Sequence, residues 1–191
     1  MSDRDHIRRL ITLVENNDEI DSAKVLAEVA DISKLLREAQ VSWHKSVMLA
    51  WKDFFSEYTA SRYIDQKEFS RLIRFVETRL ARELGSLEQL LEEMQVKLNK
   101  LDKLIPPSFM YREQFVKFFN NIGKLAEGTK RSMGILEQEG YYHQSDLNLE
   151  FPRPWSYRDE VSEIYTDLIK MREICDDMKD VMRHDDDDDV F

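Results

Sequence analysis

The chain contains 191 residues, of which 42% are hydrophobic, so it is long enough to bury a sizeable core within one domain. Its formal net charge is −10, but five of the negative charges belong to one run, Asp185 to Asp189, and the rest of the chain is only mildly acidic. This balance argues against a broad basic surface, so we expect no direct binding of nucleic acid. The single cysteine excludes an intramolecular disulfide. With no apolar leader and no apolar run long enough to span a membrane, the protein is expected to be cytoplasmic and to have no membrane partner.

Only five glycines and four prolines interrupt the sequence, which favours few, long elements. The first predicted helix covers residues 3–16, and the second covers 21–62 with Asp21 as its N-cap. Apolar residues of the second helix recur at alternating intervals of three and four, with slips near Val47 and Tyr58. A break at 40–42 is the alternative to one continuous helix. The apolar positions are Val25, Val29, Ile32, Leu36, Ala39, Trp43, Val47, Ala50, Phe54 and Tyr58.

The third predicted helix covers residues 66–104. Asp65 and Glu68 have the spacing of a capping box at its start, and Pro106 ends it. At about 1.5 Å per residue it extends for roughly 60 Å, so the protein must be elongated. Its apolar seam consists of Ile73, Val76, Leu80, Leu84, Leu87, Leu91, Met94, Leu98, Leu101 and Ile105, with one additional step of four after Leu80. The pattern of an exposed, salt-bridged face is formed by Arg71, Arg74, Arg79 and Arg82, which alternate with Glu68, Glu77 and Glu83.

The fourth predicted helix covers residues 109–139, with Ser108 as its cap, and the last covers 157–183, after Ser156. Between them, residues 140–156 contain too many helix breakers for a helix and form a loop rich in aromatic residues. The stripe of the fourth helix contains Tyr111, Phe115, Phe118, Ile122, Leu125, Thr129, Met133 and Leu136. The seam of the last helix contains Tyr157, Val161, Ile164, Leu168, Met171, Cys175, Met178 and Met182.

Each long helix has one apolar stripe, so none is stable alone and all must cover one another. Short connections near residues 59–65 and 105–108 predict that consecutive helices are antiparallel neighbours. The sequence therefore predicts an all-α fold, an elongated bundle of four to five long amphipathic helices with coiled-coil-like antiparallel packing, in one domain over residues 1–183. The alternative is a pair of helical hairpins that completes its core by forming a homodimer through the same seams.

The sequence contains no recognisable pattern of catalytic or ligand-binding residues. None of its four histidines forms the Glu-x-x-His pair that helical bundles use for metals, and no Gly-rich phosphate loop or Gly-x-Ser-x-Gly turn is present. Cys175 lies on an apolar seam, where a thiol usually behaves as a buried hydrophobe and not as a nucleophile. Adjacent carboxylates such as Asp176 and Asp177 are interpreted as solvated surface. We therefore expect a protein that is not an enzyme, with no cofactor and no metal site.

The C-terminus is the most distinctive segment. Residues 184–191 contain five consecutive aspartates followed by Val190 and Phe191, and adjacent like charges predict a disordered acidic tail. Residues 185–191 resemble the acidic, Phe-terminated tail by which bacterial single-stranded-DNA-binding proteins recruit replication and repair partners, although they lack the proline that usually precedes the final Phe there. The resemblance implies docking into a basic pocket of a partner protein. The alternative is a tail that only keeps the protein soluble.

These features predict a non-enzymatic protein-protein interaction module, an adaptor or regulatory subunit of a larger complex. Its acidic tail would dock a basic partner pocket, with charge steering the encounter and the terminal Phe fixing the register. The alternative is an acidic inhibitor or immunity-type protein that mimics nucleic acid and blocks a toxic or DNA-binding protein. The predicted partner-binding residues are Asp185, Asp186, Asp187, Asp188, Asp189, Val190 and Phe191 of the tail and Tyr141, Tyr142 and Trp155 of the aromatic loop.

Overall fold

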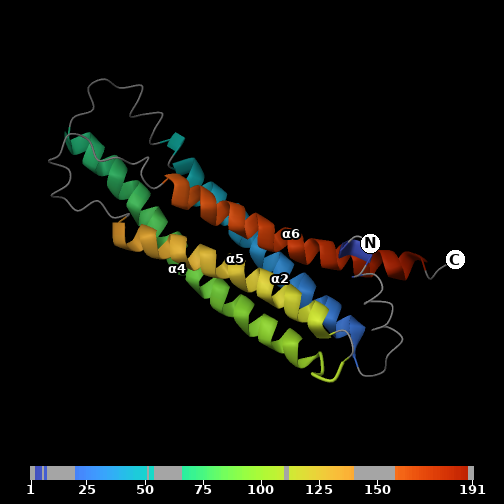
Figure 1. Ribbon diagram of the computed structural model, residues 1–191. Coiled ribbons are helices and arrows are strands. Elements are labelled where there is room, and N and C mark those ends of the chain that lie inside the picture. Colours follow the sequence, from blue (N-terminus) through green and yellow to red (C-terminus); the bar gives the residue numbers. More distant parts are fainter. Residues whose placement is uncertain are drawn as a thin grey trace.

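The computed structural model describes residues 3–5, 7, 20–50, 52–53, 66–109, 112–139 and 158–188; within these ranges it leaves out the side chains of 66–70, 72–73, 138–139, 158 and 180–188. Apart from Ile20, Asp21 and the connection 104–109, every described residue is helical and none lies in a strand. The main elements are α2 (Ser22–Trp43), the π-helix η1 (His44–Met48), α4 (Gln66–Lys103), α5 (Arg112–Glu139) and α6 (Arg158–Asp188), shown in Figure 1. None of the described helices is long and apolar enough to cross a membrane.

The long helices lie lengthwise beside one another, as Figure 1 shows. α2 packs against both α4 and α6, and α5 packs against α6 and, less extensively, against α4. Contacts run in opposite order along α2 and α4, because Asp31 pairs with Lys97 whereas Ser42 pairs with Glu83. The described helices therefore form a helical bundle in which each long helix has two helical neighbours.

The core lies along the apolar seams that the sequence predicts. Every seam residue of α4 from Val76 onward is buried, and so is every seam residue of α6 from Val161 to Met178. In α2 and α5 only Ala39 and Leu125 are partly exposed among the predicted seam residues whose side chains are described. The spacing of apolar residues thus predicts correctly which face of each helix is buried.

The second predicted helix does not end at the break considered at 40–42. Its hydrogen-bonding pattern changes a few residues later. α2 continues into η1, where the backbone N–H of Leu49 donates to the carbonyl of His44, a π-type bond five residues back. Residues 49–50 and 52–53 are again helical, and 51 and 54–62 lie outside the described residues. The slip near Val47 has its physical cause here, because a π turn accommodates one extra residue in the seam.

The fourth helix begins at Arg112, three residues after the predicted start, because the connection that follows α4 is longer than expected. Phe109 is buried, and its N–H donates to the carbonyl of Pro106, so these residues form turns and not a helical turn capped by Ser108. The guanidinium of Arg112 donates to the carbonyl of Ile105 at 2.6 Å and to Oδ1 of Asp102 at 2.5 Å. The first bond satisfies a carbonyl group just beyond the end of α4, and the second is an ion pair with a side chain in its last turn.

The last helix is longer than predicted. α6 continues to Asp188, five residues beyond the predicted end, and its backbone includes four of the five aspartates that were expected to be disordered. No glycine or proline interrupts residues 183–188, and each residue added to an existing helix gains one backbone hydrogen bond. Residues 189–191 lie outside the described part of the chain, as do the loop 140–156 and most of the first predicted helix.

Candidate functional site

Most of the predicted partner-binding residues lie outside the described part of the chain. Tyr141, Tyr142, Trp155 and residues 189–191 are not described, and for 185–188 only the helical backbone is. Their role in binding therefore stays a prediction. Within the described residues, a small pocket lies between α2 and α4, beside the π-helix.

The π-helix is anchored on its α6 side by two aromatic contacts. The indole of Trp43, only 1% exposed, donates from Nε1 to the carbonyl of Val161 at 3.0 Å. The ring of His44 lies 5.7 Å from that of Tyr165, measured between centroids. π turns of this kind occur frequently at functional sites. The side chains that precede this turn line the pocket.

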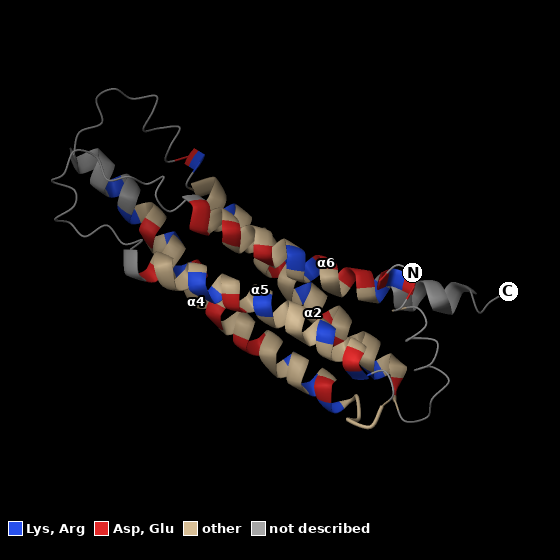
Figure 2. Cartoon of the chain, viewed as in Figure 1, with Lys and Arg blue, Asp and Glu red and all other residues tan. Residues whose placement is uncertain are grey.

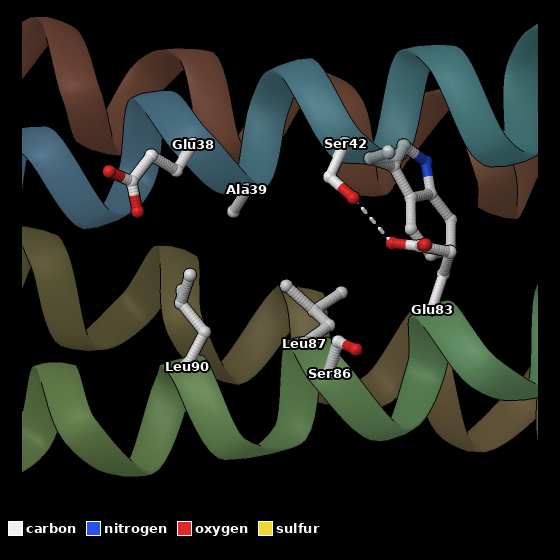
Figure 3. Close-up of a pocket in the computed structure, with 8 residues that line it drawn as sticks. Glu38, Ala39, Ser42, Glu83, Ser86, Leu87 and Leu90 are labelled. Atoms are coloured by element: carbon white, nitrogen blue, oxygen red, sulfur yellow. Dashed lines mark hydrogen bonds between the residues drawn. The ribbon is translucent and has the colours of Figure 1, made fainter.

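The pocket has a volume of about 190 Å³ and lies between one face of α2 and one face of α4 (Figure 3). α2 contributes Glu38, Ala39, Ser42 and Trp43, and α4 contributes Glu83, Ser86, Leu87 and Leu90. Figure 3 shows Glu38 at one end of the row and the Ser42–Glu83 pair at the other, with Ala39, Leu87 and Leu90 between them. The lining is mainly apolar between the two helices, with the Ser42–Glu83 pair at one end and the exposed side chain of Glu38 directed outward at the other.

Glu83 is the unusual member of this pocket, because it is a carboxylate that is only 8% exposed. The hydroxyl of Ser42 donates to Oε2 at 2.7 Å. Its other oxygen, Oε1, lies 4.0 Å from Nε of Arg82, whose side chain is 67% exposed. Burying a carboxylate is costly unless it is paired, and this exposed guanidinium compensates it only weakly. Ser42 and Arg82 are thus the partners of this carboxylate at the interior end of the pocket.

The sequence interpretation placed Glu83 on an exposed salt-bridged face, and the structure shows that this is wrong. The interval of four residues from Leu80 to Leu84 was the sequence signal that position 83 lies near the buried face. A strict alternation after Leu80 would place position 83 on the seam, and in the bundle positions 83 and 84 are both buried. At this point the line of buried residues moves around the helix by one position, so two adjacent residues both face the interior.

A second polar cluster joins α2 to α6 and centres on Asp176. Its carboxylate accepts a hydrogen bond from the buried hydroxyl of Ser33 and lies 3.6 Å from Nη2 of Arg37 and 3.6 Å from Nε of Arg172. Arg172 also donates from Nη1 to Oε1 of Gln40 at 2.6 Å. The interpretation of Asp176 as solvated surface is therefore wrong, whereas Asp177 is exposed as expected. These contacts tie α2 to α6.

An open groove of about 570 Å³ lies between α5 and α6 and carries charges of both signs. Ser132 donates to Oε2 of Glu163 at 3.3 Å across it. Burial raises the pKa of Asp167. The positive charge of Lys170 lowers this pKa, and the negative charge of Glu163 raises it further. Gly128 permits the close approach of α5 here, since a Cβ at that position would lie 3.3 Å from Oδ2 of Asp167. Its mixed charges define no single class of ligand.

Nucleophilic chemistry has no support at Cys175, which is fully buried on the α6 seam as predicted. Burial, and secondarily the charge of Asp176, raises the pKa of this thiol to about 12, so the thiolate is scarce at neutral pH. No group of three or more His, Cys, Asp or Glu side chains suited to a metal occurs among the described residues. No protein-family model matches the sequence, and no curated protein and no solved structure is significantly similar to it. The function of this chain must therefore be inferred from the side chains and geometry of its own bundle.

Proposed function

We propose that this protein is a non-enzymatic helical protein-protein interaction module, an adaptor or regulatory subunit of a larger complex. The observation that carries the proposal is the acidic C-terminal segment, in which the five aspartates are followed by Val190 and Phe191 and the first four aspartates belong to the last turns of the long helix α6. α6 carries the backbone of Asp185 to Asp188 toward the end of the bundle at which α2 begins (Figure 1). Concentrated negative charge followed by an aromatic residue suits a partner with a basic surface and a small apolar pocket.

The bundle also offers apolar side chains on its outer surface. Phe75 is 54% exposed and Val96 is 55% exposed. The guanidinium of Arg79 lies 4.6 Å from the ring centroid of Phe75 and covers part of it. Single exposed apolar residues are common on soluble proteins, so they add contact area to the proposal without defining an interface.

We further infer coiled-coil-like antiparallel packing of neighbouring helices and a cytoplasmic location. The first is supported by the three-four seam spacing and by the opposite order of contacts along α2 and α4. The second is supported by the single free cysteine. A homodimer formed through the seams is not favoured, because the described seam residues are covered within one chain.

The alternative, an acidic inhibitor that mimics nucleic acid, requires acidic residues gathered on one continuous face. Figure 2 instead shows basic and acidic residues interspersed along the helices in view. The exposed residues of α5, for example, include Lys117, Lys124 and Lys130 beside Glu113 and Glu127. This distribution favours the interaction module over the mimic.

The test is recovery of native partners with the full chain and with a chain lacking residues 185–191. We expect the truncated chain to lose at least one partner that the full chain recovers, while both show the same thermal unfolding. Two matched variants separate the contributions. Phe191→Ala removes the aromatic anchor, and replacement of the five aspartates by asparagine removes the charge but keeps Val190 and Phe191. Unchanged recovery after truncation would show that the tail has no docking role.

A further inference from the structure

We propose that the polar contacts between α2 and α6 are a register-setting device. They fix how far α6 lies along α2 and exclude alignments that the apolar seams alone would allow. The contacts form the α2–α6 cluster, which consists of Ser33, Arg37 and Gln40 of α2 and Arg172 and Asp176 of α6. The inference concerns the fold of the bundle and does not rest on the proposed function.

The apolar seams of α2 and α6 do not by themselves define one alignment. Both repeat every seven residues, so that buried Val25 is followed by buried Ile32 in α2, and buried Leu168 is followed by buried Cys175 in α6. A slide of α6 along α2 by seven residues, or about 10 Å, would again place apolar side chains against apolar side chains. Residues 140–157 join α5 to α6, and a connection of this length does not prevent such a slide.

The carboxylate of Asp176, by contrast, fits the opposite helix in one alignment. The hydroxyl of Ser33, which is 1% exposed, donates to Oδ1 of this carboxylate, and Oδ2 lies 3.6 Å from Nη2 of Arg37. The residues seven positions before and after Asp176 are Ile169 and Arg183. A slide in either direction would therefore take the carboxylate away from Ser33 and Arg37. In one direction it would also bring Arg183 toward Arg37, a pair of like charges.

A second contact imposes the same alignment two turns further along α2. Arg172 donates from Nη1 to Oε1 of Gln40 at 2.6 Å, and its Nε lies 3.6 Å from Oδ2 of Asp176. Gln40 in turn donates from Nε2 to the hydroxyl of Tyr165 at 3.5 Å. Because Arg172 contacts both Gln40 and Asp176, the contacts at Ser33 and at Gln40 form together in the same alignment.

The energetics of such a cluster favour selection of an alignment over added stability. The side chains of Arg172 and Asp176 are only 25% exposed, so their charges are partly removed from water. Attraction between such charges offsets the cost of desolvation only where the geometry is good, and complete apolar replacement is often neutral or stabilising. In a shifted alignment the cost would remain and the pairing would be lost. On the α5 side of α6, the hydrogen bond from Ser132 to Glu163 is longer, at 3.3 Å, so α2 provides the stronger polar constraint.

The indole of Trp43 reports the alignment at a separate point of the same interface. It is 1% exposed, and its Nε1 donates to the carbonyl of Val161 at 3.0 Å. Since every residue of α6 has a backbone carbonyl, this bond does not select the alignment. A shifted α6 would surround the indole with different residues and would therefore change its NMR signal.

The experiment compares the full chain with an apolar variant of the cluster by NMR of the indole N–H groups and by urea unfolding. In the parent protein we expect one Trp43 indole signal that is protected from hydrogen exchange. In the apolar variant we expect at least two Trp43 signals, or protection lowered at least about tenfold, with unchanged helix content and a urea midpoint no lower than that of the parent. The apolar variant carries Ser33→Ala, Gln40→Leu, Arg172→Leu and Asp176→Leu.

Two outcomes would overturn the proposal. One protected Trp43 signal at the position of the parent signal would show that the seams alone set the alignment. Lowered protection together with a lower urea midpoint would show that the cluster contributes stability and does not select the alignment. Should the apolar variant fail to fold, Ser33→Ala/Asp176→Leu removes only the buried hydroxyl and its carboxylate. At least two Trp43 signals are expected from it, and one parent-like signal would refute the proposal.

A matched control places the same apolar residue types on exposed positions of the same helices and likewise leaves the net charge unchanged. We expect it to keep one protected Trp43 signal, because the α2–α6 cluster remains complete. If the control also gives several Trp43 signals, the added leucines are the cause and the proposal fails. The control carries Lys34→Ala, Glu38→Leu, Lys170→Leu and Asp177→Leu.

Discussion

The hydrogen bond between Ser42 and Glu83 gives the sharpest stability prediction, because it places a nearly buried carboxylate between two long helices. Substitution Ser42→Ala removes the one hydroxyl that donates to this carboxylate, at 2.7 Å. Hydrogen bonds to charged groups contribute about 1.5–3 kcal/mol, and Arg82 is too exposed and too distant to replace this one. We therefore expect Ser42→Ala to lower the free energy of unfolding by about 2 kcal/mol.

A double-mutant cycle separates this bond from simple loss of packing. Removing one partner of a buried polar pair is more destabilising than replacing both partners by apolar groups. The double variant Ser42→Ala/Glu83→Met is therefore expected to be more stable than Ser42→Ala alone, with a coupling energy of at least about 1 kcal/mol. Ser86→Ala is the matched control, since this serine lines the same pocket but is exposed, and it is expected to change stability by less than about 0.5 kcal/mol.

The assay is equilibrium unfolding in urea followed by far-ultraviolet circular dichroism, with the slope of the transition compared between variants. If Ser42→Ala unfolds within about 0.5 kcal/mol of the parent protein, the carboxylate of Glu83 must be compensated by water, and the reasoning on buried charge fails.

Three further predictions concern other parts of the bundle. Gly134→Ala is expected to raise the free energy of unfolding by up to about 1 kcal/mol, because a Cβ there meets open space; Gly128→Ala should gain less, because its Cβ would lie 3.3 Å from a carboxylate oxygen of α6. Urea unfolding of the two variants side by side tests this, and a larger gain at Gly128 would contradict it. Asp176→Ala should cost about 1–3 kcal/mol and its exposed neighbour Asp177→Ala almost nothing, so equal losses would refute the role of the α2–α6 cluster. The Cys175 thiol has its pKa raised from 9.0 to about 12 in the folded protein, so the unfolded chain releases this proton first as pH rises. The corresponding stability is fully present below about pH 9 and is lost toward pH 12 by up to about 1.4 kcal/mol per pH unit, a slope that Cys175→Ala should lack in alkaline unfolding experiments.

The candidate site could be predicted only in part from the sequence. The seam irregularities near Val47 and after Leu80 are visible in the spacing of apolar residues, and in the bundle they coincide with the π-helix and with the buried Glu83. The spacing does not reveal that Ser42 of α2 lies opposite Glu83 of α4, which is 41 positions later in the sequence. That pairing depends on the register between α2 and α4, which is set by packing of the whole interface.

The sequence by itself determined the helical class, the buried face of each described long helix and the place of Cys175 on an apolar seam. It could do so because side chains three and four residues apart share one face of a helix, and an apolar stripe of that spacing has no stable alternative to burial. Only the tertiary structure decided which helices are neighbours, that Glu83 and Asp176 are drawn into interfaces, and that a small pocket remains beside Trp43. A polar side chain at the edge of a stripe is exposed or buried according to what lies opposite it, and that neighbour belongs to a distant part of the chain.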